Sequence, residues 1–348
     1  MTDRDRVGRT ALAELLETGG LCGARLCTRV AARASKFPTI VQRNIFLEYE
    51  LSAFPAVAGM GVGFPAGVLE EYAVTNRAFL QGATGLAIQA AMSNDPFAKD
   101  HEAYVNARSD RDPDWVEYDV SGDEIEKTPF VFFRSPSRHR TIRSRSQINQ
   151  VCQLLAVAPS AEFAILLRAL VDSGPIVLYR VGVAHHRGPG WRRLLISHLC
   201  KSATLLALTW IGSIEFARVI EASEAFYGTR ADAPGALYSL SLDVNGGQLS
   251  ALDVECPYLF RVKSSSHRSE PFRAYLDLLV STGHIDVNAA HWLSHFCTRT
   301  IDSGDRKSAL SVSVHHLKHR LMGEPRGRAK AYLHLEALRG AASGAHEA

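Results

Sequence analysis

Five pairs of short segments, in which apolar and polar residues alternate, recur along the chain. The pairs begin near residues 45, 115, 176, 236 and 308, so successive pairs start roughly 60 to 70 residues apart. Alternation with a period of two is typical of β-strands that bury one face. Short turns such as NGG at 245–247 join the two members of a pair, which favours a hairpin. The sequence therefore predicts ten strands arranged as five β-hairpins.

The stretches between these hairpins have helical character. Apolar residues recur there at intervals of three and four, as in a helix that packs one face on a sheet. The expected helical stretches are residues 67–92, 146–173, 202–226 and 271–297, with Ser146 and Ser202 at N-cap positions. A β-β-α unit repeated five times accounts for this order. A split α+β chain with irregular strand pairs is the alternative.

Polar and apolar residues separate onto the two faces of each strand. In FLEYEL, Leu47, Tyr49 and Leu51 share one face, and Glu48 and Glu50 share the other. Strands in hairpins can close into one antiparallel barrel, which leaves no exposed edge and places the apolar faces under the helices. We therefore predict an α+β fold. It is a ten-stranded antiparallel barrel built from five ββα(α) repeats, with the helices outside and a polar, solvent-filled lumen.

Length and composition allow one large domain or two of ordinary size, because 348 residues with 46% hydrophobic content can bury a large core. The hairpin pattern favours a single barrel domain over residues 41–338. A helical N-terminal extension is expected at 1–40 and a disordered tail at 339–348.

The net charge and the cysteine content limit the partners and the redox environment that we expect for the protein. The formal net charge of +3 argues against a general nucleic-acid-binding surface, although the arginine-rich run RSPSRHRTIRSRSQ is either a solvated connector or an anion-binding rim. The six cysteines include no C-x-x-C pair, which favours reduced thiols. No secretory segment is visible and no apolar run reaches about 18 residues, so we expect a cytoplasmic protein with no membrane partner.

This layout resembles the ABBA prenyltransferases, also called PT barrels. That family has five α-β-β-α repeats, whose ten antiparallel strands are ringed by helices around a solvent-filled reaction chamber. The resemblance covers residues from about 40 to 336 and rests on repeat count, repeat order and lumen polarity rather than on a diagnostic motif.

The resemblance implies a transferase that moves a prenyl group from an allylic diphosphate to an aromatic small molecule, an indole or a peptide side chain. It implies basic residues that hold the diphosphate, tyrosines that shield the allyl cation and an acid that orients or deprotonates the acceptor. No cofactor is required on this reading, with Mg²⁺ on the diphosphate as an alternative. A non-catalytic barrel that binds a peptide or small ligand for a biosynthetic pathway is the other reading, because a fold alone does not decide function.

The basic residues expected in the lumen come from the third and fifth hairpins. In RAKAYLHL, Arg328, Lys330, Tyr332 and His334 fall on one face. Cations beside a phenol would suit a diphosphate and its allyl cation, so Tyr332 is the candidate cation shield. An exposed edge strand with a basic face is the alternative. The candidate diphosphate ligands are Arg180, Arg193 (with Arg192 as the alternative of opposite parity), Arg328 and Lys330.

The acids expected in the lumen come mainly from the other hairpins. Each of them could be an ordinary salt-bridge partner, but one carboxylate near the acceptor could accept its proton. Glu48 and Glu117 are the preferred catalytic candidates because they hold the corresponding position in two repeats. The other lumen candidates are Asp119, Asp243, Glu255, His186, His315 and His334.

Other motifs fit less well. GMGVGFPAG lacks the G-x-G-x-x-G spacing, and neither a P-loop nor D-D-x-x-D is present, which argues against nucleotide chemistry and a helical, metal-cluster prenyl enzyme. The pairs His185/His186 and His315/His316 invite a metal site. Neighbouring strand residues point to opposite faces, so only one member of each pair could contribute to a common site. We therefore predict no metal.

Overall fold

The computed structural model describes the chain in segments separated by gaps. They are residues 12–37, 45–51, 56–63, 81–93, 113–135, 141–154, 160–184, 187–188, 190–199, 238–257, 269–295, 299–302, 308–322 and 329–339.

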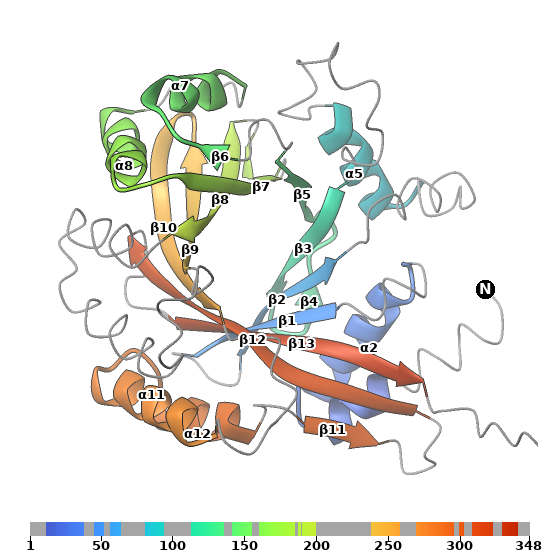
Figure 1. Cartoon of the computed structure of the whole chain (residues 1–348). Coiled ribbons are helices and arrows are strands. Elements are labelled where there is room, and N and C mark those ends of the chain that lie inside the picture. The colour runs from blue at the N-terminus through green and yellow to red at the C-terminus, as the bar shows by residue number, and fades with distance from the viewer. Residues whose placement is uncertain are drawn as a thin grey trace, which may run out of the picture.

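Ten antiparallel strands form a closed ring (Figure 1). Its five hairpins follow one another in the sequence. The pairing of β13 with β1 joins the last strand to the first, and the pairing of β10 with β12 closes the remaining gap. The ring strands are β1 (Ile45–Glu50), β2 (Ala56–Gly63), β3 (Pro113–Ser121), β5 (Phe130–Arg134), β7 (Ile176–Val183), β8 (Trp191–Leu199), β9 (Tyr238–Asn245), β10 (Gln248–Pro257), β12 (Ser308–Met322) and β13 (Ala329–Arg339). Three short strands pair beside the ring: β4 (Glu124–Ile125), β6 (Thr141–Ile142) and β11 (Arg299–Asp302).

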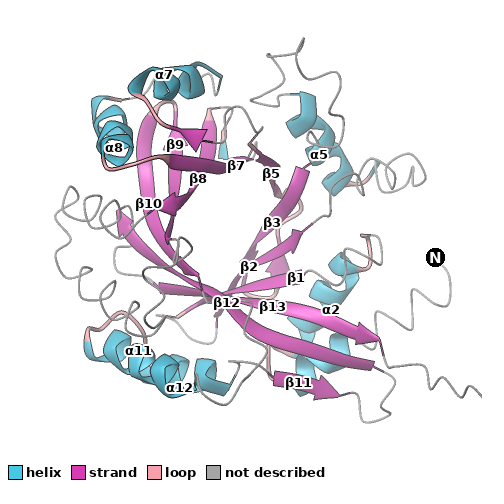
Figure 2. Ribbon diagram, viewed as in Figure 1, coloured by secondary structure: helices cyan, strands magenta, loops and turns pink. Residues whose placement is uncertain are grey.

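The helices lie around the outside of this ring, as Figure 2 shows. Those with bounds inside the described residues are α2 (Ala24–Ala34), α5 (Ala83–Ser93), α7 (Arg145–Leu154), α8 (Ala161–Asp172), α11 (Ser269–Ser281) and α12 (Val287–His295). The predicted α+β class, the ten-stranded barrel and the outer position of the helices are confirmed. Helices follow the first, second and fourth hairpins, but the expected helix at 202–226 lies outside the described residues. The ββα repeat therefore stays a prediction.

One expected helix start is wrong. Ser146 lies inside α7, and Ser144 just precedes the helix, where its hydroxyl accepts from the backbone N–H of Gln147 at 3.5 Å. Ser160 caps α8 in the same way, with its hydroxyl 3.2 Å from the backbone nitrogen of Phe163. A run of serines offers several capping side chains, and the pattern of apolar residues does not choose among them.

The hydrophobic core lies between the strands and the helices. Leu47, Tyr49 and Leu51 face outward into it, as alternation predicts, and the Tyr49 ring packs 4.7 Å from Trp292 of α12. The N-terminal segment joins the same core: the Tyr49 hydroxyl donates to the carbonyl of Leu21 at 2.5 Å. Because the apolar faces are used in this way, the opposite face of each ring strand points into the lumen.

Candidate active site in the barrel lumen

Arg193 lies at the centre of a buried ion-pair network. From β8 its guanidinium donates to both carboxylate oxygens of Asp243 on β9, at 2.6 and 3.0 Å. It also donates to Glu117 of β3 at 3.1 Å. Because β7 and β5 separate β8 from β3 in the ring, the contact with Glu117 reaches across the lumen. The sequence left Arg192 and Arg193 as alternatives for the inward position, and the structure places Arg193 there.

A second network connects β1 with β13. Lys330 forms an ion pair with Glu48, and Tyr332 lies beside the same carboxylate and helps to lower its pKa. The strands pair in register, with Glu48 opposite Tyr332 and Glu50 opposite Lys330. The Lys330 side chain keeps 28% of its surface exposed, whereas that of Glu48 keeps 6%.

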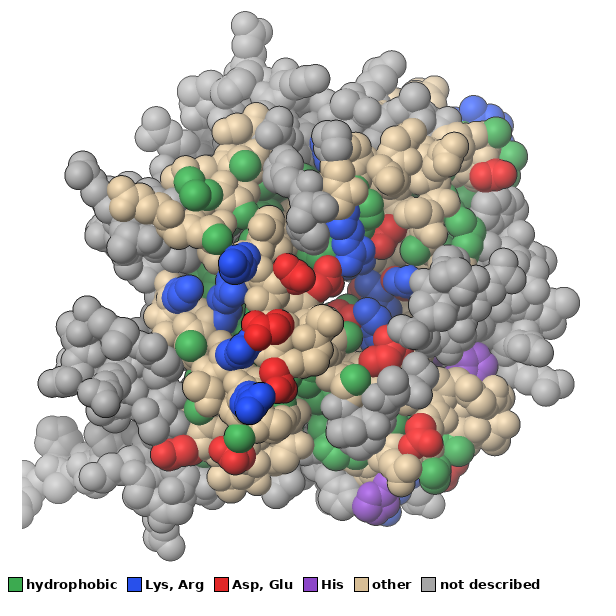
Figure 3. Space-filling model, turned by 180° about the vertical axis from the view of Figure 1, so that it is seen from behind, with side chains coloured by type: hydrophobic (Ala, Val, Ile, Leu, Met, Phe, Trp, Pro, Cys, Tyr) green, Lys and Arg blue, Asp and Glu red, His purple; other side chains and the backbone are tan. Residues whose placement is uncertain are grey.

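A third network joins β12 with β10, and its cations, Lys318 and Arg320, were missed by sequence reasoning. Lys318 is 5% exposed and lies 3.1 Å from the Ser241 hydroxyl, 3.4 Å from Asp253 and 3.5 Å from Glu255. Arg320 donates to both oxygens of Asp253, at 2.6 and 3.2 Å. Figure 3, viewed from behind, shows acidic and basic side chains mixed around a hollow in the middle of the molecule.

These networks set the protonation of the two preferred catalytic acids in opposite directions. Burial alone would raise the pKa of Glu48, but the ammonium groups of Lys330 and Lys318 outweigh burial and lower it to about 2. Burial raises the pKa of Glu117. The positive charge of Arg193 opposes this rise, and the negative charge of Glu48 adds to it. Glu48 is thus held as a carboxylate, while Glu117 is more readily protonated, which is the pattern of an acid–base pair.

The cations of the three networks converge. Arg193 and Lys318 both lower the pKa of the deeply buried Asp243, whose burial acts in the opposite direction. Burial would lower the pKa of Lys330, but Glu48 raises it, while the positive charge of Arg193 is close enough to act against that rise. Arg193, Lys318 and Lys330 therefore share one region of the lumen, around the carboxylates of Glu48, Glu117 and Asp243.

An aromatic wall, defined here as Phe46, Trp115, Phe130, Phe132 and Trp191, lines the side of the lumen formed by β1, β3, β5 and β8. Its members are at most 5% exposed apart from the partly buried Trp115, and the last four form a hydrophobic cluster separate from the outer core. Phe46 and Trp115 have ring centroids 4.6 Å apart.

Arginines stack on this aromatic wall. Arg193 lies 5.2 Å from the Phe130 ring centroid, and Arg180 lies 5.6 Å from that of Trp115. These are cation–π distances, so the wall already stabilises positive charge. Sequence reasoning missed the wall: FVFFR, which supplies Phe130 and Phe132, shows no alternation, and the inward rings of the other strands were not singled out.

Two glycines make room for the wall. A Cβ atom at Gly61 of β2 would lie 2.2 Å from Cζ2 of Trp115, and one at Gly182 of β7 would lie 2.5 Å from Cε1 of Phe132. Both glycines face the lumen. In GMGVG of β2 the inward positions therefore carry no side chain, which leaves space for an aromatic ring of the neighbouring strand.

The expectation that only one of His315 and His316 faces the lumen is wrong. The register of β12 against β13 shifts between Val314 and His316, which marks a β-bulge at His315. Both imidazoles therefore point inward: Nδ1 of His315 lies 2.6 Å from Nδ1 of His316. His316 stacks on Tyr332 at 4.1 Å, and His315 meets the edge of Phe46 at 4.8 Å. Beyond the bulge, inward positions fall on even numbers, which brings Lys318 and Arg320 into the lumen.

The remaining predicted site residues take these places. His334 packs against Phe46 with ring centroids 4.7 Å apart, and Glu255 pairs with Lys318. Asp119 accepts from Arg187 at 2.7 Å, and its side chain is 39% exposed. Arg328 and His186 lie outside the described residues. The roles assigned to all of these residues stay predictions.

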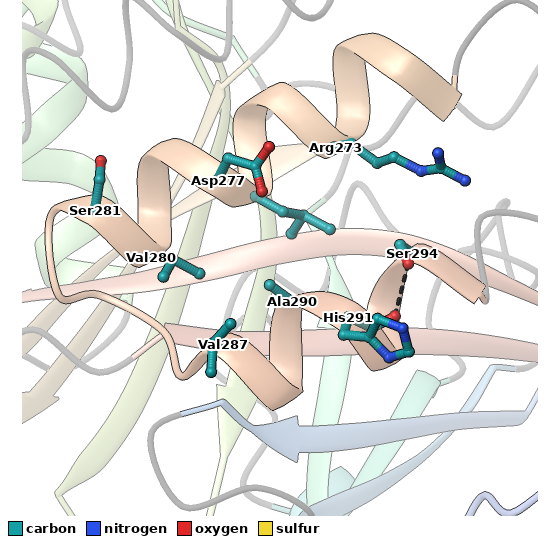
Figure 4. Close-up of a pocket in the computed structure, with 9 residues that line it drawn as sticks. Arg273, Asp277, Val280, Ser281, Val287, Ala290, His291 and Ser294 are labelled. Carbon is teal, nitrogen blue, oxygen red and sulfur yellow. Dashed lines mark hydrogen bonds between the residues drawn. The ribbon is translucent and has the colours of Figure 1, made fainter.

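Outside the lumen, a groove of about 630 Å³ lies between α11 and α12 (Figure 4). Arg273, Asp277 and His291 line it, and the Ser294 hydroxyl donates to the carbonyl of His291 at 2.6 Å. None of the predicted site residues lines this groove.

Within the described part of the chain, no three His, Cys, Asp or Glu side chains are grouped closely enough to hold a metal ion. No helix in the same part of the chain is long and apolar enough to cross a membrane.

A closed ring of ten antiparallel strands, ringed by helices and polar inside, is the ABBA or PT-barrel fold that the sequence resembles. Among solved structures, the chain is similar to 6-dimethylallyltryptophan synthase from Micromonospora olivasterospora in complex with DMASPP and Trp. The TM-score is 0.56 at 17% identity, over 94% of this chain and 95% of that one. A second structure, described as 6-dimethylallyl tryptophan synthase, gives 0.52 at 16% identity over 96% and 97%. No family model matches the sequence, and the comparison with curated proteins finds no match. At such identities the likeness establishes the fold.

Proposed function

We propose that the chain is a prenyltransferase that moves an allylic prenyl group from its diphosphate to an aromatic or peptide side-chain acceptor inside the barrel. The observation that carries this proposal is the convergence of Arg193, Lys318 and Lys330 beside the aromatic wall. The similar structure that holds DMASPP and Trp supports dimethylallyl diphosphate and tryptophan as the first substrates to test.

The cations carry the ionisation step. When the C–O bond of the donor breaks, its electron pair leaves with the diphosphate, and Arg193, Lys318 and Lys330 stabilise that charge. The allyl cation left behind is stabilised by the faces of Tyr332 and the aromatic wall, which also keep water away from it. Arg180 and Arg328 complete the proposed set of diphosphate ligands.

Glu48 positions the acceptor. Because Lys330 and Lys318 hold it as a carboxylate, it accepts a hydrogen bond from an N–H or O–H of the acceptor. That bond raises the electron density of the acceptor ring, whose carbon then attacks the allyl cation. Glu117 is the second acid of this site, and its raised pKa allows it to take up a proton as the negatively charged diphosphate enters.

Thermal stabilisation tests the donor site. A ligand that binds only the folded state stabilises it, by about 2.7 kcal/mol at 100 times its Kd. We expect dimethylallyl, geranyl or farnesyl thiolodiphosphate to raise the melting temperature more than inorganic pyrophosphate does. Lys330→Ala should abolish the shift, whereas Lys127→Ala, on an exposed turn, should retain it.

Product formation from dimethylallyl diphosphate and L-tryptophan, followed by mass spectrometry with and without Mg²⁺, then tests transfer and any contribution of the ion. If no diphosphate stabilises the wild-type protein, the prenyltransferase proposal fails. A non-catalytic barrel that binds a peptide or small ligand then becomes the better reading.

A further inference from the structure

The pair formed by His315 and His316 lies between the charged and the aromatic parts of the lumen. His316 stacks on Tyr332, which lies opposite Glu48 in the strand pairing, and His315 packs against Phe46 of the aromatic wall. The two rings are held at 74° to each other, with the centroids 4.8 Å apart. Both side chains are only partly buried, so they line the space that a substrate would enter. The function proposed above does not use them.

The contact between the two Nδ1 atoms fixes complementary tautomers. In a hydrogen bond between two neutral imidazoles, one Nδ1 carries the proton and the other accepts it. The donating ring therefore has a lone pair on Nε2, and the accepting ring has Nε2–H. The pair thus presents one basic and one acidic nitrogen, joined by an internal hydrogen bond.

Such a pair can conduct a proton. When the basic Nε2 takes up a proton, the same ring can pass its Nδ1 proton to the second ring, which can release its Nε2 proton. Uptake breaks a C–H bond and forms an N–H bond, the internal transfer breaks one N–H bond and forms another, and release gives a proton to water. The pair is then neutral with its tautomers exchanged, and proton exchange with solvent restores the starting tautomers before the next turnover. The bulge at His315 is what makes this possible, because regular alternation would place the two rings on opposite faces.

We propose that the His315–His316 pair removes the proton that the acceptor carbon loses after the new carbon–carbon bond has formed. The C–H electron pair returns to the aromatic ring, and the proton passes to the basic Nε2 and along the pair towards solvent in the lumen. This role rests on the proposed prenyl transfer and adds a named proton acceptor to it. Glu48 keeps its separate task at the N–H or O–H of the acceptor.

The surroundings keep both rings neutral between turnovers. Burial and the neighbouring His316 lower the pKa of His315 well below its usual value, and burial lowers that of His316 to about 4. A weak base is sufficient here, because the cationic ring adduct is a very strong acid. The charged and titratable groups that face the pair are Glu48 on β1, Arg180 on β7, Glu255 on β10, Lys318 on β12 and His334 on β13.

Kinetics with L-tryptophan and its indole-deuterated form test the role. In His316→Gln and His315→Gln, proton removal should become rate-limiting, with kcat lower by on the order of 10²-fold and a primary isotope effect absent from the wild type. The KM for dimethylallyl diphosphate and its stabilising effect on melting should stay unchanged. His316→Ala should regain activity with added imidazole, which a structural role would not produce. His291→Gln, an exposed histidine on α12, is the matched control.

The tautomers can be measured without turnover. Nitrogen-15 NMR of histidine-labelled protein should show one Nδ1–H and one Nε2–H ring at positions 315 and 316. Two rings with the same tautomer, or variants that transfer prenyl groups at the wild-type rate without an isotope effect, would overturn the proton relay while prenyl transfer stands. If the wild-type protein transfers no prenyl group to tryptophan or to other indoles, phenols and peptides, the proposed function fails and the relay fails with it.

Discussion

Arg193 joins three strands of the ring through its guanidinium group. It is 7% exposed, and both of its acidic partners are equally buried, so neither carboxylate can recover its hydration if the arginine is lost. A buried ion pair adds little to stability over an apolar pair, but removal of one partner is costly because the other charge stays buried.

We therefore expect Arg193→Met to lower the free energy of unfolding by about 3–5 kcal/mol, the usual range for a broken buried ion pair. Urea unfolding followed by circular dichroism measures this. Arg145→Met is the control, because Arg145 pairs with Asp172 on the exposed surface of the helices. Equal unfolding midpoints for the two variants would show that Arg193 is not a structural centre of the lumen.

Glu48 makes stability depend on pH in the acid range. Its folded pKa of about 2 lies below the ordinary value of 4.5, so the carboxylate contributes stability above pH 4.5 that is lost as the pH falls towards 2. The contribution is at most about 3.5 kcal/mol, because the folded pKa lies about 2.5 below the ordinary value and each pKa unit corresponds to about 1.4 kcal/mol.

The expected result is that Glu48→Gln is destabilised at pH 7 yet loses less stability than the wild type between pH 4.5 and 2. Lys330→Met should move the acid transition to higher pH, since the main opposing charge is gone. The unfolding free energies of the wild type, the two single variants and the double variant across this pH range measure the coupling between Glu48 and Lys330. Parallel pH profiles for the wild type and Glu48→Gln would contradict the assignment.

At the scale of elements, β2 shapes the lumen because its inward-facing glycines carry no side chain. Trp115 of β3 occupies the space where a side chain at Gly61 would stand. Gly61→Ala should therefore displace the indole and cost about 1–3 kcal/mol, the usual range for overpacking. Unfolding and tryptophan fluorescence measure both effects.

Gly23→Ala is the matched control for that change, since nothing lies within 4 Å of a Cβ atom there and its φ of −66° suits any residue. In the Trp115→Ala background, Gly61→Ala should cost much less, because the clashing ring is absent. An unchanged cost in that background would mean that the two residues do not interact.

Alternation of residue types predicted the inward and outward faces of the strands, because one face of each is fixed by the apolar core. Glu48, Asp243 and Lys330 lie where that pattern placed them. The bulge at His315 has no local signature and inverts the parity beyond it, so Lys318 and Arg320 were missed. The contact of Arg193 with Glu117 also escaped prediction, because it depends on closure of the ring between strands that are not neighbours.

At the scale of the whole molecule, the barrel depends on contacts between residues that are far apart in the sequence. β13 lies between β1 and β12, so the last strand completes the ring against the first. It also carries Lys330 and Tyr332, the partners of Glu48. Without β13, β1 and β12 would each present unpaired backbone groups, and Glu48 would lose the charge that stabilises it.

Removal of residues 329–348 is therefore expected to abolish the fold as a whole rather than to unfold one edge. The chain without these residues should lack a cooperative urea transition and should associate through its open strand edges, as size-exclusion chromatography and circular dichroism would detect. A chain that ends at Arg339 is the control. Because it retains all of β13, it should unfold in one transition close to that of the full-length chain. A cooperative, monomeric product of the longer deletion would mean that the other nine strands of the ring form a stable sheet without closure, and the lumen could then be rebuilt by adding β13 as a separate peptide.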